Sequence, residues 1–235
     1  MINKRERPSF LSYPHGRRSE AEYAELVRGK SVIIVGPAGY LRNENKGDWI
    51  NSFELVVRVN HAIPIAFPDD YGNRTDVLYH IMSHRGQRAK EVVNMEEILE
   101  WKRHGIKWLV IRKSATSDRV LKLAPLLDGQ FPWSCIHHRF EDSVCRSVRV
   151  KSPNTGIMAI AHLLNAGVKC LTVTGFDLYS SGCYENYGDL QAGEDAKEVN
   201  ARWHDLESQK EYLRSMIRRD KRIQIDPHLE GAIGL

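Results

Sequence analysis

Short apolar runs alternate along the chain with longer segments whose apolar residues recur at helical spacing. The runs predict strands at 31–35, 54–60, 76–80, 107–111, 134–138, 170–174 and 222–225. Spacing and capping residues predict helices at 20–27, 88–103, 117–127 and 157–164, and a last long helix that opens near 203. This alternation predicts an α/β protein: a single Rossmann-like domain with a mainly parallel central sheet flanked by helices.

Two segments interrupt the alternation. Residues 1–19 are polar and contain two prolines, which predicts an N-terminal arm ahead of a single domain at 20–235. Residues 178–202 are polar and rich in Tyr, Gly, Asn and Asp. A loop of that length is typically functional, so we expect a lid there.

Composition narrows the class of protein. At 235 residues and 42% hydrophobic, the chain can bury a full core. It has no apolar run near the roughly 20 residues that cross a bilayer, and its first ten residues lack the apolar stretch of a signal peptide. We expect a cytoplasmic protein without a transmembrane segment. The net charge of +4, with basic clusters at both ends, is compatible with peripheral contact to an anionic membrane.

The four cysteines show no CxxC spacing, which favours free, mostly buried thiols over a disulfide or a metal site. The aromatic residues are not interleaved with basic ones, and the net charge is small, so a nucleic-acid partner is not expected.

Two turns are candidates for binding a phosphate. The strand at 31–35 ends abruptly at Gly36-Pro37-Ala38-Gly39, where a ligand could approach the backbone, and Asn60 ends the next strand. Further on, Asn154 or Thr155 caps a helix whose positive end, with Gly156, is available to an anion. Ordinary tight turns and a plain helix cap explain the same residues, and the sequence leaves both interpretations open.

Three stretches, in the same order, resemble the motifs of the eukaryotic-type sialyltransferases, which use CMP-activated donors. VGPAGYLR at 35–42, with VRVN at 57–60 and YGNRT at 71–75, is similar to the family's long motif. PNTG at 153–156, closing with TGF at 174–176, resembles the short motif, and the segment from His204 to Glu207 resembles the last, very short one. The resemblance covers most of the chain from 31 to 211. It implies a GT-A-like variant of the fold, in a short soluble microbial or viral member of the family.

The resemblance also implies a reaction. An acceptor hydroxyl on a glycan attacks the anomeric carbon of a CMP-linked acidic sugar, and CMP leaves with inversion. Sialic acid is the default donor, and Kdo is the alternative. His204 is the implied base, because an imidazole can take a proton near neutral pH. Glu207 would orient that helix or the imidazole, while Gly72 and Arg74 would support the site structurally.

The implied contacts to the donor are Gly36, Pro37, Ala38, Gly39, Asn60, Asn154, Thr155, Gly156, Gly175, Phe176 and Tyr184. The sequence contains no Asp-x-Asp triplet of the kind that holds a divalent ion on a nucleotide sugar. We therefore expect a metal-independent transferase in glycan biosynthesis, with no cofactor other than its CMP-sugar co-substrate.

The chain departs from the family pattern at four places. The family's third motif, HYYE or HYWE, is matched at best by CYEN at 183–186, which lacks the His. Pro37-Ala38 stands where the long motif usually has Asn and Ser. Val32 and Val168 stand near the positions of the cysteines that form the family's disulfide. His204 and Glu207 are closer together than the family's His and Glu, which have four residues between them.

Two other functions remain open at this point. An NAD(P)-binding Rossmann oxidoreductase would explain a strand followed by a glycine turn, although the G-x-G-x-x-G fingerprint is absent. A sugar-nucleotide-binding protein without catalytic activity would explain the motifs and their departures equally well.

Overall fold

The computed structural model describes residues 17–83, 92–112, 117–185, 187 and 205–235. Its strands form one sheet in the order β5-β4-β3-β2-β1-β6-β7, and every neighbouring pair is parallel. In chain order they are β1 (Ser31–Val35), β2 (Leu55–Val59), β3 (Val77–His80), β4 (Trp108–Ile111), β5 (Trp133–Cys135), β6 (Cys170–Thr174) and β7 (Ile223–Ile225). The predicted parallel α/β architecture is confirmed.

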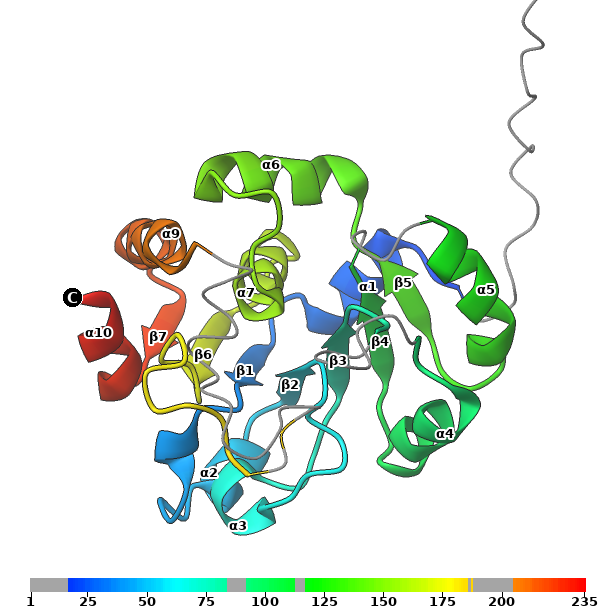
Figure 1. Ribbon diagram of the computed structural model, residues 1–235, viewed down its shortest axis with the longest axis horizontal. Coiled ribbons are helices and arrows are strands. Elements are labelled where there is room, and N and C mark those ends of the chain that lie inside the picture. Colours follow the sequence, from blue (N-terminus) through cyan, green and yellow to red (C-terminus); the bar gives the residue numbers. More distant parts are fainter. Residues whose placement is uncertain (1–16, 84–91, 113–116, 186, 188–204) are drawn as a thin grey trace, which may run out of the picture.

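Helices cover both faces of the sheet, which explains why all residues of β2, β3 and β4 are buried. One face packs against α1 (Glu20–Val27), α6 (His138–Val148), α7 (Thr155–Asn165) and α9 (Leu206–Arg219). The other packs against η1 (Gly39–Leu41), α2 (Gly47–Asn51), α3 (Pro68–Tyr71), α4 (Met95–Arg103) and α5 (Ser117–Leu127). Figure 1 shows α6, α7 and α9 above the sheet, α2, α3 and α4 below it, and α10 (Pro227–Ile233) beside β7.

Helix α7 is the most deeply buried helix in the described structure, because every residue from Thr155 to Leu164 is buried. Its sequence is apolar all round, as expected of a helix enclosed on all sides. It contacts β2, β3 and β6, and Asn154 caps it by accepting a hydrogen bond from the Ile157 N–H at 2.8 Å. The amino end of this helix is therefore fixed over the centre of the sheet.

Two predicted boundaries were wrong. The helix predicted at 88–103 begins at Met95, because Asn94 forms a capping box with Glu97. Residues 84–91 lie outside the described structure, and Val92 forms an isolated bridge instead of a helical turn. The strand predicted at 134–138 ends at Cys135, and His138 begins α6.

The predicted arm and lid lie largely outside the described residues. Of the arm, residues 17–19 are described, and the Arg18 N–H donates to the Trp133 carbonyl at 2.8 Å. Of the lid, residues 178–185 and 187 are described, so the lid stays a prediction.

None of the four cysteines forms a disulfide, as predicted, but all four are partly exposed and not mostly buried. Within the ranges that the structure covers, no helix is both long enough and apolar enough to cross a membrane.

Candidate active site

A pocket lies where the direction of the strand order reverses. From β1 the chain adds β2 to β5 on one side, and it later adds β6 and β7 on the other. The loops that leave β1 and β6 therefore diverge at the carboxyl edge, where open α/β sheets bind ligands. The pocket's described walls come from the ends of β1, β2 and β6, the start of α7 and the loop after β6: Pro37, Ala38, Val59, Asn60, Asn154, Thr155, Gly156, Gly175, Phe176, Asp177, Leu178, Tyr179, Gly182, Cys183 and Tyr187.

The pocket is narrow in this conformation. Its free volume is about 40 Å³.

Two glycines let the loops after β1 and β6 pass each other. A Cβ atom at Gly36 would lie 2.2 Å from the Gly175 carbonyl oxygen, and one at Gly175 would lie 2.4 Å from the Gly36 oxygen. Gly175 also has a φ of +73°, which favours glycine. The Gly36 N–H donates to Thr174 at 2.8 Å, and the Ala38 N–H donates to Gly175 at 2.9 Å. These two glycines are thus required by the packing of one backbone on another.

The turn at 36–39 offers fewer free backbone N–H donors than the sequence led us to expect. The N–H groups of Gly36 and Ala38 are used as described, the Gly39 N–H donates to Gly182 at 3.1 Å, and Pro37 has no N–H. In this conformation the N–H groups of Gly36 and Gly39 are therefore not available to a phosphate. Pro37 and Ala38 line the pocket, whereas Gly36 and Gly39 lie behind its wall.

Asn60 lies at the end of β2 with its side chain buried and only 2% of the residue exposed. Its backbone is left-handed, with a φ of +49°, a conformation that Asn tolerates better than most residues. Its N–H donates to Tyr79 at 2.7 Å, which fixes the turn. Its Oδ1 atom is buried and has no hydrogen-bond partner among the described residues. An unpaired buried amide oxygen on a pocket wall is a site for a ligand's N–H or O–H group.

The amino end of α7 forms the opposite wall. Thr155 and Gly156 are the first two residues of the helix, so their N–H groups have no carbonyl partner inside it. No other described residue accepts from either group. Thr155 and Gly156 therefore present the N–H groups and the positive dipole end that bind anions.

Phe176 packs directly on this helix start. A Cβ atom at Gly156 would lie 2.4 Å from the Phe176 ring, so only glycine allows the ring to lie there. Both residues line the pocket, and their contact with a donor stays a prediction.

Tyr184 is buried beside α3 and does not line the pocket. Its ring centroid is 4.7 Å from that of Tyr71, and burial raises the pKa of its hydroxyl to about 12. Tyr187 lines the pocket instead, and its hydroxyl donates to the Val59 carbonyl at 3.0 Å. Tyr184, predicted as a donor contact, is therefore not among the described residues that line the pocket, whereas Tyr187 is.

The loop after β6 has a strained turn that the sequence did not indicate. Leu178 and Tyr179 are consecutive left-handed residues, with φ values of +54° and +70°. This conformation costs about 1–2 kcal/mol for each residue. The buried Asp177 carboxylate accepts from the Ser181 N–H at 2.6 Å, and the Ser180 hydroxyl donates to the Asp177 carbonyl at 2.8 Å. These bonds hold the turn against the pocket.

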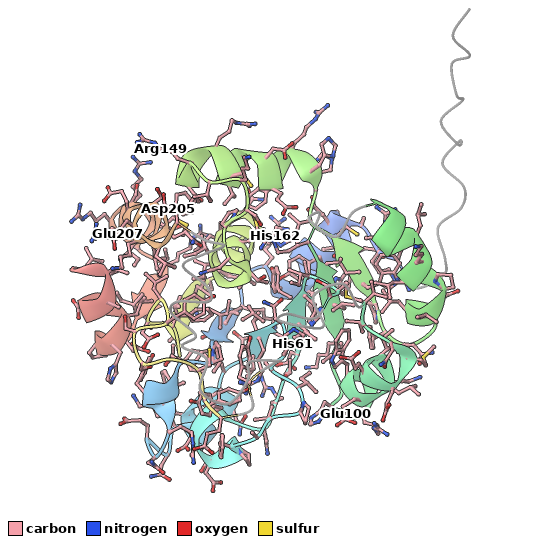
Figure 2. All side chains as sticks on the ribbon, viewed as in Figure 1. His61, Glu100, Arg149, His162, Asp205 and Glu207 are labelled. Carbon is pink, nitrogen blue, oxygen red and sulfur yellow. The ribbon has the colours of Figure 1, made fainter. Side chains whose placement is uncertain are left out.

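The two residues predicted to catalyse the reaction have different outcomes. His204 lies outside the described residues. Glu207 lies at the start of α9, where Asp205 is the N-cap (Figure 2). The Glu207 side chain is 77% exposed and pairs with Lys210 at 2.8 Å, so in this conformation it faces solvent and not the pocket.

Gln209 takes the inward position on α9. It has four residues between itself and His204, which is the spacing of the family's His and Glu. Its side chain is fully buried and accepts a hydrogen bond from the Asn154 N–H at 2.8 Å. The family spacing was the signal in the sequence that could have identified this residue.

A buried ion pair also supports the α7 start. Arg112, which follows β4, donates to the Pro153 carbonyl at 2.8 Å and to the Thr155 hydroxyl at 3.4 Å. Its guanidinium lies 3.2 Å from the Glu141 carboxylate, and both residues are buried. A lone arginine directly after an apolar strand was the only signal for this pair.

A second, partly buried network fixes Gly175 through its backbone N–H. The Tyr40 hydroxyl donates to Asp226 and accepts from the Gly175 N–H at 2.7 Å. The Thr174 hydroxyl donates to the same carboxylate at 2.8 Å. Burial, together with this carboxylate, raises the pKa of Tyr40 well above its usual value.

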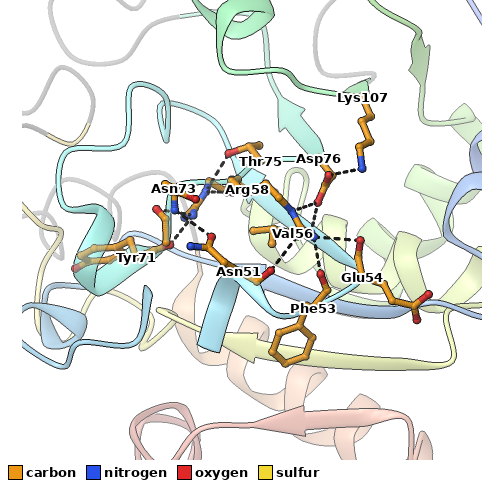
Figure 3. Close-up of polar contacts among 12 residues, drawn as sticks. Asn51, Phe53, Glu54, Val56, Arg58, Tyr71, Asn73, Thr75, Asp76 and Lys107 are labelled. Carbon is orange, nitrogen blue, oxygen red and sulfur yellow. Dashed lines mark hydrogen bonds and ion pairs between the residues drawn. The ribbon is translucent and has the colours of Figure 1, made fainter. Parts of the chain in front are cut away.

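The YGNRT stretch of the long motif is structural, as the sequence predicted for Gly72 and Arg74. Arg58 in β2 is buried and donates to the Gly72 and Arg74 carbonyls at 3.3 and 3.2 Å. Figure 3 shows Arg58 beside Thr75, whose hydroxyl accepts from the guanidinium at 3.0 Å. Burial lowers the pKa of Arg58 to about 10. Arg74 in turn donates to Asp76, whose carboxylate accepts the Val56 N–H at 2.7 Å. These bonds anchor the strand that ends at the pocket.

Asp70 on α3 fixes the loop after β1 in a similar way. Its carboxylate pairs with Arg42 and accepts from the Asn45 N–H at 3.1 Å. The loop is tied to α3 a second time because the Tyr71 hydroxyl donates to the Ala38 carbonyl at 2.7 Å.

Comparisons with known proteins were made for sequence and for fold. Residues 9–125 match the model of glycosyltransferase family 29 (sialyltransferase). Type 2 lactosamine alpha-2,3-sialyltransferases of Homo sapiens and Pan troglodytes are each 26% identical over 183 residues, covering 63% of this chain. The chain spans 55% of the length of these relatives.

Solved sialyltransferases share the fold. A mammalian sialyltransferase matches 91% of this chain and 75% of its own, with a TM-score of 0.61 and 18% identity. A complex described with Gal-beta-1-3GalNAc-ortho-nitrophenol gives the same coverage and identity with a TM-score of 0.59. A variant of the sialyltransferase CST-II in complex with CMP gives a TM-score of 0.54 at 13% identity, over 88% of this chain and 86% of its own.

The likeness in structure confirms the predicted GT-A-like α/β fold. The family model and the curated relatives identify the same family from sequence alone, and the stretches that resembled its long and short motifs meet at one pocket. The family model, the curated relatives and the structural neighbours together support the sialyltransferase family, glycosyltransferase family 29, for this chain.

Proposed function

We propose that the protein is an inverting glycosyltransferase that moves sialic acid, or a related acid such as Kdo, from a CMP donor to a hydroxyl on a glycan. One observation carries the proposal: parts of two sialyltransferase-like motifs, far apart in the sequence, line the same pocket. Pro37, Ala38 and Asn60 come from the long motif, while the 154–156 segment and Phe176 come from the short one.

The pocket's polar groups suit a CMP leaving group. The N–H groups of Thr155 and Gly156 at the start of α7 are the proposed donors to the phosphate, where negative charge grows as the glycosidic bond breaks. The unpaired Oδ1 of Asn60 would accept from an amino or hydroxyl group of the donor. We keep His204 as the proposed base on the strength of the motif resemblance.

The acceptor is proposed from the names of similar proteins. The curated relatives are type 2 lactosamine alpha-2,3-sialyltransferases, and one solved neighbour is described in complex with Gal-beta-1-3GalNAc-ortho-nitrophenol. Galactose-terminated disaccharides of these two kinds are therefore the first acceptors to test.

We propose that the transfer needs neither a divalent metal nor a cofactor. A CMP donor has a single phosphate, and the sequence lacks the Asp-x-Asp triplet of metal-dependent sugar transferases. We also retain a cytoplasmic, reducing compartment in the proposal, in keeping with four cysteines that form no disulfide.

The test is a transfer assay with purified protein. CMP-sialic acid and CMP-Kdo are each incubated with the two disaccharides, with and without EDTA, and both CMP release and glycosylated product are followed. We expect product from one donor in the presence of EDTA. If CMP binds and no product forms, the protein is a sugar-nucleotide-binding protein without activity. Tight binding of NAD in place of CMP would favour the oxidoreductase, and full transfer by a His204→Ala variant would contradict the assignment of the base.

A further inference from the structure

Gln209 is a polar side chain with 0% exposure on a helix that is otherwise mostly polar and accessible. The side-chain amide forms two hydrogen bonds in opposite directions. Its Oε1 accepts from the Asn154 N–H at 2.8 Å, and its Nε2 donates to the Asp205 carbonyl at 3.2 Å. An amide has both a donor and an acceptor, so it can join two backbone groups that no apolar side chain of similar size could join.

On the α7 side, the bond fixes the residue that caps the helix. The Asn154 side chain accepts the Ile157 N–H, while its own backbone N–H is buried and donates to Gln209. Without that acceptor, the Asn154 N–H would be left unpaired in the described structure, next to the two N–H groups proposed to bind the donor phosphate.

On the α9 side, the bond fixes the residue that begins the helix. The Asp205 carboxylate caps α9 by accepting the Ser208 N–H at 3.0 Å. The Asp205 carbonyl receives both the backbone N–H of Gln209, at 3.3 Å, and its side-chain Nε2. In the sequence, Asp205 directly follows His204.

We propose that Gln209 is a positioning residue that joins the amino end of α7 to the start of α9. It touches no substrate itself. It holds the proposed phosphate donors of α7 at a fixed distance from the cap of α9. This role rests on the proposed function for its effect on catalysis, although the link between the two helices can be tested without any substrate.

Two substitutions separate the two bonds. Gln209→Leu removes both. Gln209→Glu keeps the shape and the acceptor for the Asn154 N–H, but an ionised carboxylate cannot donate to the Asp205 carbonyl, and it places negative charge beside the anion site. Burial raises the pKa of such a carboxyl, and the protonated form regains the missing donor. The defect of Gln209→Glu in CMP binding should therefore be large at high pH and shrink at low pH.

Glu211→Gln is the matched control, because Glu211 is exposed on the same helix and pairs only with Arg214 among the described residues.

The first readout is CMP affinity by calorimetry, measured at pH 8 and pH 5.5 beside the wild-type protein. We expect Gln209→Leu to raise the Kd for CMP about tenfold at both pH values, the size of losing one buried hydrogen bond. Gln209→Glu should match or exceed that loss at pH 8 and return to within about threefold of wild type at pH 5.5. At saturating donor, kcat should fall about tenfold for Gln209→Leu.

The second readout is hydrogen exchange in the first turn of α7, which requires no ligand. Faster exchange there in Gln209→Leu than in the wild-type protein at the same pH, with exchange close to wild type in Gln209→Glu, which keeps the acceptor for the Asn154 N–H, supports the link even if the wild-type protein transfers no sugar. Folded variants with wild-type exchange and CMP affinity at both pH values would overturn the proposal. So would a Gln209→Glu defect that acid does not reduce, which decides the matter if Gln209→Leu fails to fold.

Discussion

Replacing Asn60 by glycine tests whether this residue serves the ligand or the fold. Glycine keeps the left-handed backbone, whose φ is +49°, and it keeps the N–H that donates to Tyr79. It removes the buried Oδ1 atom that has no described partner. The substitution should therefore leave the free protein as stable as before or more stable, while it weakens the binding of the ligand.

Two opposing effects set the expected change in the free energy of unfolding. An unpaired buried polar atom costs about 1–3 kcal/mol, which the substitution recovers in the free protein. Glycine costs about 0.5–1 kcal/mol through its greater freedom in the unfolded chain. The free energy of unfolding should therefore stay the same or rise by up to about 2 kcal/mol. The loss of one hydrogen bond to the donor, about 0.5–1.5 kcal/mol, should raise the Kd for CMP roughly 2- to 12-fold.

Urea denaturation of the free protein and calorimetry with CMP measure the two effects. Asn60→Ala serves as the control for backbone strain, because alanine in this left-handed conformation should lower the free energy of unfolding by about a further 1–2 kcal/mol. A glycine variant that is more than about 1 kcal/mol less stable than wild type, while binding CMP equally well, would show that Asn60 serves the fold alone.

Three further substitutions test the surrounding structure. Gly156→Ala would place a methyl group 2.4 Å from the Phe176 ring; we expect a loss of about 1–3 kcal/mol in urea denaturation and weaker CMP binding, and unchanged values would contradict the packing described. Arg112→Met leaves the buried Glu141 carboxylate without its guanidinium; stability should fall by about 3–5 kcal/mol, with partial recovery when Glu141 is also made apolar. For Asp70, burial alone would raise the pKa, but backbone N–H groups and a guanidinium lower it on balance. The contribution of the Asp70 carboxylate to the free energy of unfolding is present above the unfolded pKa of about 3.9 and is lost as pH falls through the lower folded value. Asp70→Asn should therefore flatten the acid side of the curve of unfolding free energy against pH.

The sheet was largely predictable because most of its strands are apolar runs that can be recognised from the local sequence alone. The second half of the chain shows the limit of that approach. Helix α6 escaped notice although Phe140, Val144 and Val148 recur at intervals of four, because the preceding strand was extended too far into it. Helix α10 was missed although Asp226 caps it and Pro227 occupies its first position, a pair that indicates a helix start.

The site was predictable where one residue's role depends on its own neighbourhood, and not where it depends on a distant partner. Asn154, Thr155 and Gly156 form a helix start that local capping chemistry indicates. By contrast, the use of the Gly36 N–H follows from the pairing of β1 with β6, a tertiary contact that no local pattern contains. Which face of α9 points inward likewise depends on packing. The sequence therefore led us to predict Glu207 as a site residue, whereas Glu207 is exposed and Gln209 is the buried one.

The close approach of Gly36 and Gly175 also sets an order of events during synthesis. Strand β1 is made before β2 to β5, but its other neighbour, β6, begins only at Cys170, after those four strands. Until then one whole side of β1 is open, and the wall formed by Gly175 and Phe176 does not exist. A nascent or truncated chain that ends before β6 should therefore contain the entire segment 9–125 matched by the family model and still be unable to enclose a nucleotide. The pocket can thus form only after β6 has been made.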